Sequence, residues 1–153
     1  MARKIKVLLS KLGLDVHNRG IITVAKELRN SGMEVVYIGN ALPKEIISAA
    51  IQEDVSVVGV SSLGGAHLTL GIPLIQEAKE KGFKDEIAFL IGGVFPPADI
   101  LELKEIAAMS QPYHVAVSPH NFNSTTIGLA ASCPGYMRIL HIFESVMSKS
   151  SNR

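Results

Sequence analysis

The chain has 153 residues, 47% of them hydrophobic, and its 15 Lys and Arg residues nearly balance 14 Asp and Glu residues. This suits a single domain over residues 1–153 with a sizeable core, and it excludes a strongly basic surface for nucleic acid. One cysteine, Cys133, excludes an internal disulfide and a cysteine-cluster metal site. The apolar run near the amino terminus is too short for a signal peptide or a membrane span, so we expect a cytoplasmic protein without membrane partners.

Short apolar runs alternate with helical patterns over the first two thirds of the chain. The runs predict buried parallel strands at Ile5–Leu9, Val35–Ile38, Val55–Val60 and Ile87–Ile91. Helical spacing predicts helices over 21–28, over 46–51 after a first-turn Pro43, over 68–78, and from residue 100. His67 would start or cap the third helix, in which Pro73 predicts a kink or a late start.

This alternation predicts an α/β fold of the flavodoxin-like, doubly wound type. We expect a five-stranded parallel sheet of order 2-1-3-4-5 between two layers of helices. The stretch 107–137 differs in composition from the rest of the chain, because it contains no Asp, Glu, Lys or Arg. Within it, Tyr113–Asn121 alternates like a strand and Ser124–Ser132 predicts a short helix. A last amphipathic helix is predicted from Ile139 to Met147.

Three unusual loops follow the first, third and fourth predicted strands. They are Asp15–Gly20, Ser61–His67 and Gly92–Pro97. In a sheet of order 2-1-3-4-5 these strands are neighbours, and ligands of such sheets lie beyond the carboxyl ends of the strands. We therefore expect the three loops to face one another in one site. The chain has neither GxGxxG nor GxxxxGK[ST], so this site lacks the phosphate cradle of dinucleotide and nucleoside-triphosphate sites.

Asp15 and His17 carry the chemistry of the first loop. A metal-bound imidazole usually donates its other N–H to a carboxylate, which fixes the tautomer and raises the basicity of the ring. One histidine cannot hold a tetrahedral zinc ion alone, but it can be the axial ligand of a metal that a macrocycle already holds. Ser61 adds a hydroxyl group, and the glycines of the other loops allow a ligand close to the backbone.

These residues resemble the three motifs of cobalamin-binding domains, in the family's order and spacing. Asp15-Val16-His17-Asn18-Arg19-Gly20 fits DxHxxG, Ser61 and Leu63 fit SxL, and Gly92-Gly93 fit the later GG. The sequence around these motifs, over about residues 4–106, resembles the cobalamin-binding subunit or domain of methylmalonyl-CoA mutase and related acyl-CoA mutases.

The resemblance implies a cofactor, residue roles and a partner. His17 would be the axial ligand of cobalt in adenosylcobalamin, and Asp15 would orient it. Gly20, Ser61, Leu63, Gly92 and Gly93 would accommodate the nucleotide tail that His17 displaces. In this family the carbon–cobalt bond breaks homolytically, and the resulting radical abstracts hydrogen from an acyl-CoA held by a separate barrel. The chain would therefore be the cofactor-binding subunit of an isomerase, inactive alone, with a barrel-type large subunit as partner.

Two parts of the sequence depart from the mutase pattern. Val16 and Asn18 stand where mutases commonly have Gly and Asp, and a β-branched residue at position 16 would resist a positive φ. Residues 107–153 lack the family's Gly-rich turn, and Tyr113–Ser132 resembles a fragment of enolase-superfamily sugar-acid dehydratases. That fragment contains no carboxylate, so it implies neither a metal nor a dehydratase activity. Being a strand followed by a helix, it would take the place of the fifth unit.

Two other functions compete with the mutase subunit. One is a corrinoid carrier protein for methyl transfer. Such carriers usually have a helical domain ahead of the cobalamin fold, whereas here the first strand starts within a few residues of Met1, which favours the mutase. The other is a non-catalytic remnant of the fold that no longer binds the cofactor.

Overall fold

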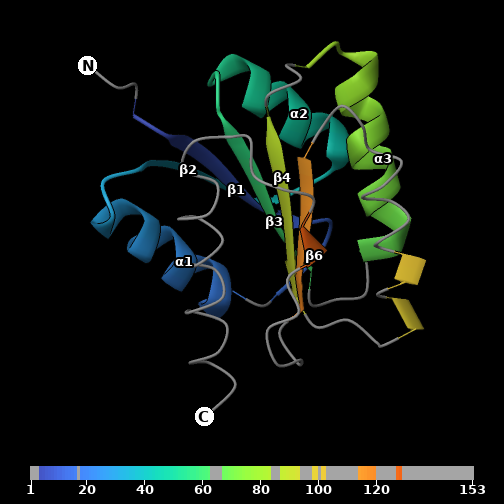
Figure 1. The fold of residues 1–153 in the computed structure, drawn as a ribbon, viewed down its shortest axis with the longest axis horizontal. Helices are drawn as coiled ribbons and strands as arrows, with labels where there is room; N and C mark the ends of the chain where they lie inside the picture. The colour runs from blue at the N-terminus through green and yellow to red at the C-terminus, as the bar shows by residue number, and fades with distance from the viewer. Residues whose placement is uncertain are drawn as a thin grey trace.

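The computed structural model describes residues 4–16, 18–62, 67–83, 87–93, 98–99, 101–102, 114–119 and 127–128. Strands and helices alternate along the chain (Figure 1). The elements are β1 (Lys6–Leu12), α1 (Arg19–Asn30), β2 (Glu34–Ala41), α2 (Pro43–Gln52), β3 (Val57–Ser62), α3 (His67–Glu80), β4 (Ala88–Gly93), β5 (His114–Pro119) and β6 (Ile127–Gly128). Residues 101–102 are helical, as the sequence predicts for the fourth helix, and residues 98–99, ahead of its predicted start, are helical too.

The strands form one sheet of order β2-β1-β3-β4-β5-β6. The first five strands are parallel and follow the predicted order 2-1-3-4-5. The five predicted parallel strands are thus present, and the two-residue β6 adds a sixth strand that pairs antiparallel with β5. Ile127 and Gly128 lie within the stretch predicted as a short helix, so that prediction is wrong for these two residues. The helix predicted over Ile139–Met147 lies outside the described residues.

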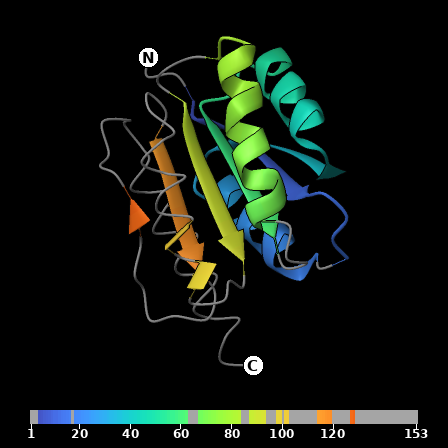
Figure 2. The same ribbon diagram turned by 90° about the vertical axis from the view of Figure 1, so that its right-hand side faces the viewer.

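Helices cover both faces of the sheet, which gives the predicted three layers (Figure 2). Successive side chains of a strand point to opposite faces, and two buried clusters follow this alternation. One packs α1 against residues such as Val7, Leu9, Val57 and Leu90. The other packs α2 and α3 against the intervening positions, such as Leu8, Val58 and Phe89. β1 and β3 lie between other strands and are almost entirely buried, so the first part of each, Val7–Leu9 and Val57–Val60, is mostly apolar.

The three helices end in the same way. The second residue after each helix has a positive φ, and the N–H of the residue that follows it donates to a carbonyl five positions earlier, as in a Schellman motif. These pairs are Met33 to Leu28, Val55 to Ala50 and Phe83 to Ala78. Gly32 (φ +86°) and Gly82 (φ +65°) have the positive angle at two ends, and Asp54 (φ +50°) has it at the third. Each donor residue is apolar and buried, so each helix end is also fixed by packing.

Two prolines affect α2 and α3 differently. Pro43 occupies the first turn of α2, as predicted, and the main-chain N–H of Leu42 donates to Glu45 Oε2 at 2.8 Å. α3 starts at His67 and continues through Pro73, so the late start considered from the sequence is wrong. Within the described ranges, no helix has the length and apolarity that crossing a membrane requires.

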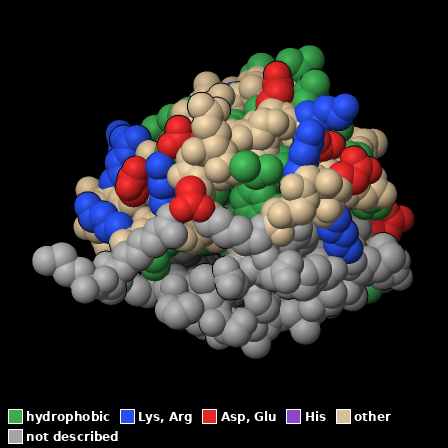
Figure 3. Space-filling view, turned by 90° about the horizontal axis from the view of Figure 1, so that it is seen from above, with side chains coloured by type: hydrophobic (Ala, Val, Ile, Leu, Met, Phe, Trp, Pro, Cys, Tyr) green, Lys and Arg blue, Asp and Glu red, His purple; other side chains and the backbone are tan. Residues whose placement is uncertain are grey.

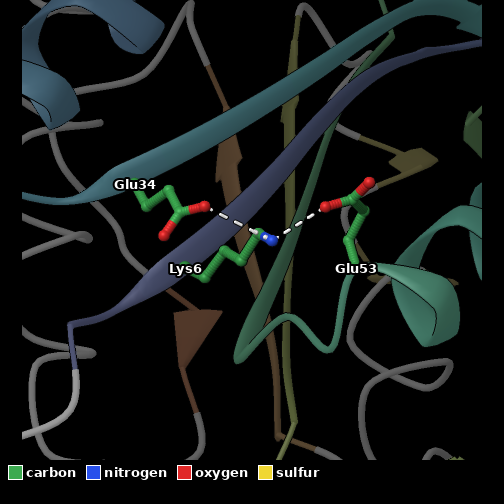
Figure 4. Close-up of polar contacts among 3 residues, drawn as sticks. All are labelled: Lys6, Glu34 and Glu53. Atoms are coloured by element: carbon green, nitrogen blue, oxygen red, sulfur yellow. Dashed lines mark hydrogen bonds and ion pairs between the residues drawn. The ribbon is translucent and has the colours of Figure 1, made fainter.

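The edge of the sheet at the amino ends of the strands has mixed charge. Figure 3 views this edge and shows Lys and Arg side chains interspersed with Asp and Glu. Lys6 connects three elements there (Figure 4). Its Nζ lies 2.7 Å from Oε2 of Glu53, at the end of α2, and 3.3 Å from Oε1 of Glu34, at the start of β2. The opposite edge, at the carboxyl ends, bears the motifs of the candidate site.

Candidate functional site

The candidate site begins where β1, β3 and β4 end side by side. Lys11 pairs in register with Ser61, which pairs with Gly92. Gly93, one position further along β4, pairs with Ser62 of β3. Three adjacent parallel strands thus end at the same edge, and the three predicted loops start from these neighbouring ends. This arrangement is that of a ligand site in an open α/β sheet.

The structure locates five of the seven predicted site residues. Asp15 and Ser61 are buried, with 3% and 6% of their surfaces exposed. Gly20 lies in the first turn of α1, and a Cβ added there would meet no atom within 4 Å. Gly92 is buried, and Gly93 is the last residue of β4. His17 and Leu63 lie outside the described residues.

Asp15 lies between two exposed apolar residues. Leu14 is 95% exposed and Val16 is 86% exposed, so the turn buries the acid and leaves the apolar side chains in solvent. The positive φ of this turn belongs to Gly13, at +71°. Asp54 is the non-glycine with positive φ among the described residues, so Val16 needs no unfavourable backbone angle. The β-branched side chain at position 16 is therefore compatible with the turn.

Lys11 holds this turn, and sequence reasoning missed its role. Only 5% of its surface is exposed, and its Nζ donates to the main-chain oxygen of Asp15 at 2.6 Å and to Oδ1 of Asn18. Asn18 is the N-cap residue of α1 but makes no side-chain capping bond, because its Oδ1 accepts from Lys11. One ammonium group thus connects the end of β1, the Asp15 turn and the start of α1. The available signal was a lysine inside an otherwise apolar run.

Small residues occupy the ends of β3 and β4. Ser61 and Ser62 end β3, and the paired positions on β4 are Gly92 and Gly93. The hydroxyl oxygen of Ser62 is buried and has no hydrogen-bond partner in the part of the chain that the structure describes. Because neighbouring side chains alternate between faces, Ser61 lies on the α1 face and Ser62 on the opposite face. Gly92, which pairs with Ser61 on the α1 face, adds no side chain at the end of β4.

Comparisons with known proteins agree with this geometry. The sequence model of the family "B12 binding domain" matches residues 5–112. The chain is 44% identical over 103 residues to the 2-hydroxyisobutanoyl-CoA mutase small subunit of Aquincola tertiaricarbonis, a match that covers 67% of this chain and 75% of that subunit. It is 38% identical over 113 residues to methylmalonyl-CoA mutase of Escherichia coli (strain K12), covering 72% of this chain but 16% of that enzyme.

Solved structures share the fold. A cobalamin-binding protein from Desulfitobacterium hafniense DCB-2 superimposes with a TM-score of 0.58 at 22% identity. The match covers 64% of this chain and 48% of that one. At this level of identity the likeness shows that the fold is shared.

Proposed function

Because this chain belongs to the B12-binding domain family, we propose that it is the cobalamin-carrying small subunit of an adenosylcobalamin-dependent acyl-CoA mutase. The observation that carries the proposal is the Asp15 turn, which buries an acid two residues before His17 and is held by the buried Lys11. A turn fixed in this way would set the position of His17, and the acid would set the tautomer of its ring, as a metal-binding imidazole requires.

The donor set fits cobalamin better than a bare metal ion. Among the residues that the structure describes, no three His, Cys, Asp or Glu side chains gather where they could hold a metal. A corrin ring supplies the equatorial ligands of its cobalt, so a single protein imidazole suffices. The small residues Ser61, Gly92 and Gly93 provide room for close approach at the neighbouring strand ends.

Each residue of the chain then has a distinct role. His17 would ligate cobalt, and Asp15 would accept the second N–H of its ring. Lys11 would fix the main chain at Asp15 and the start of α1. Gly20, Ser61, Leu63, Gly92 and Gly93 would line the slot for the nucleotide tail. When bound, adenosylcobalamin supplies a carbon-centred radical through homolysis of its carbon–cobalt bond.

The proposed partner is a barrel-type large subunit that holds the acyl-CoA. The match to a separate small subunit over 75% of that relative's length supports this division of labour. The edge that bears the site also exposes Leu14, Val16 and Leu42, the last to 54%. Apolar side chains exposed around a polar site are typical of a surface that a ligand or a partner covers.

The ligand assignment is tested by spin resonance of bound cob(II)alamin. We expect base-off cobalamin with hyperfine splitting from one protein imidazole nitrogen, and we expect the splitting to vanish in His17→Ala. A base-on spectrum, or an unchanged His17→Ala spectrum, would overturn the assignment.

In a second experiment, the chain loaded with adenosylcobalamin is assayed alone with methylmalonyl-CoA and 2-hydroxyisobutanoyl-CoA. Turnover by preparations free of any large subunit would contradict the proposed division between subunits.

A further inference from the structure

The edge strand β2 contains a bulge beside the candidate site. Leu9 pairs with Tyr37 but Lys11 pairs with Asn40, so two residues of β2, Ile38 and Gly39, lie opposite Ser10 alone. Gly39 has a φ of +71°, which L side chains rarely adopt. Bulges locally redirect a strand and recur near functional sites. Here the bulge lies one residue before Lys11 and Asn40.

The bulge reverses the alternation of β2. Ile38 and Ala41 both pack with the cluster under α2 and α3, although they are three positions apart and a regular strand would place them on opposite faces. The extra residue also brings Asn40 into register with Lys11. Without it, Lys11 would pair with Gly39, and Ala41 would lie on the α1 face.

Hydrogen bonds join the bulge to β1 and the end of β2 to the turn that bears Asp15. The Ser10 hydroxyl is buried and donates to the Gly39 carbonyl oxygen at 2.9 Å, with the Lys11 carbonyl oxygen at 3.2 Å as a second acceptor. Beyond the bulge, the main-chain N–H of Gly13 donates to the Ala41 carbonyl oxygen at 2.9 Å. Gly13 is two residues before Asp15, so the end of β2 holds the turn from one side while Lys11 holds it from the other.

We infer that Ser10 and Gly39 are positioning residues for the cofactor ligand. The bulge that they form sets the register of β2 against Lys11 and Gly13, and these two residues fix the turn that carries Asp15 and His17. For cobalamin coordination the inference rests on the proposed function, whereas its effect on the turn belongs to the protein without cofactor.

Gly39 and Gly82 provide a matched pair of substitutions. Both have a positive φ, and a Cβ added at either would meet no atom within 4 Å, so a larger residue causes backbone strain without a clash. Gly82 ends α3 at the opposite edge of the sheet and therefore serves as the control. Asn tolerates a positive φ better than a β-branched residue does. Gly39→Asn should accordingly keep the bulge that Gly39→Val disrupts.

The experiment compares wild type with Gly39→Val, Gly39→Asn, Ser10→Ala and Gly82→Val. The first readout is amide hydrogen exchange of Gly13 and of residues 14–16 in the cofactor-free protein. The second is cob(II)alamin affinity together with the imidazole hyperfine splitting. Gly39→Val should accelerate Gly13 exchange about tenfold or more relative to Gly82→Val, because only the former disturbs the bond to Ala41. Its cobalamin affinity should fall about 10- to 100-fold with a weakened splitting, whereas Gly39→Asn should stay near wild type.

Ser10→Ala tests the same inference if Gly39→Val does not fold, because this substitution removes one hydroxyl group and adds no backbone strain. It should show the same changes to a smaller extent. Equal Gly13 exchange in Gly39→Val and Gly82→Val, or wild-type coordination in both Gly39→Val and Ser10→Ala, would overturn the inference. If wild type itself binds no cobalamin, the proposed function fails, and the exchange readout still decides whether the bulge positions the turn.

Discussion

The ammonium group of Lys11 lies 2.6 Å from the main-chain oxygen of Asp15, and both residues are buried. The contact is to the backbone of Asp15, so the lysine fixes the path of the main chain in this turn. An ammonium has three donors, and a second one goes to Asn18 at the start of α1. The chain segment that carries His17 is thus held at both of its ends by one side chain.

Replacing Lys11 by Met should weaken cofactor binding more than it weakens the fold. The thioether fills a similar volume, but Asp15 O and Asn18 Oδ1 lose their donor. Because the change also removes the desolvation cost of a buried ammonium, we expect the free energy of unfolding to change by less than about 2 kcal/mol. We expect cob(II)alamin affinity to fall about tenfold or more. Spectroscopic titration beside Lys26→Met, an exposed control on α1, measures this, and wild-type affinity in Lys11→Met would contradict it.

Replacing Asp15 by Asn should retain the fold and weaken the proposed binding of cobalt by His17. The amide oxygen still accepts a hydrogen bond from an imidazole N–H, but without the negative charge that raises the basicity of the ring. A decrease of about 10- to 100-fold in cobalamin affinity is expected, the usual range for loss of such a partner. Asp54→Asn removes the same charge at the opposite edge of the sheet and is the control. If both variants bind cobalamin equally well, Asp15 does not orient His17.

The sequence was sufficient to predict the sheet order and both helical layers. Continuous β-branched runs identify buried parallel strands because both faces of these strands are covered, as β3 illustrates with six buried residues. Pro43 marks the start of α2 because its fixed φ suits a first turn. Such signals are local, and a single sequence expresses them directly.

The features that position the site were not predicted, because they depend on contacts between separate segments. Lys11 looks like a charge that interrupts a strand, and its ammonium turns inward only because the Asp15 turn and Asn18 supply oxygen atoms there. The bulge at Gly39 is a mismatch between two strands, which neither strand shows alone. The short β6 depends on β5 as its partner, so a helical pattern around Ile127 gave the wrong element.

Stability at high pH should depend on Lys6. Its hydrogen bond to Glu53, supported by Glu34 and opposed by burial, raises the pKa of Lys6 above the ordinary 10.5. Because the pKa of Lys6 is higher in the folded state than in the unfolded state, its charge stabilises the fold fully at pH values below the unfolded-state pKa. This stabilisation is lost as the pH rises through the folded-state pKa. Lys6→Gln should therefore have a lower urea midpoint than wild type at pH 7, and the difference should shrink above pH 10.5.

The control for Lys6 is Lys4→Gln, an exposed site two residues earlier. It should differ little from wild type at any pH, because an exposed charge contributes little to stability. Urea titrations of the three proteins at several pH values provide the comparison. A Lys6→Gln difference that persists unchanged well above pH 10.5 would show that packing of the lysine stem, and not its charge, stabilises this edge.

The atypical end of the chain should affect the nucleotide tail of cobalamin and spare cobalt ligation. β5 occupies the fifth position of the sheet, and its last residue, Pro119, pairs in register with Gly93 at the carboxyl edge. Under the proposed function, cobalt ligation would need one imidazole held by Asp15, whereas burial of the nucleotide would need close approach along β3 to β5, which a Gly-rich turn would ease. Replacing residues 107–153 with a mutase-type "GPGT" strand and helix should therefore strengthen cobalamin binding by about tenfold, or about 1.4 kcal/mol.

Cobinamide lacks the nucleotide and is the matched control, so its affinity should be the same in both proteins. Equal cobalamin affinity in the two proteins would show that the exchanged end does not affect the pocket, and a parallel gain for cobinamide would place its effect on the corrin and not on the tail.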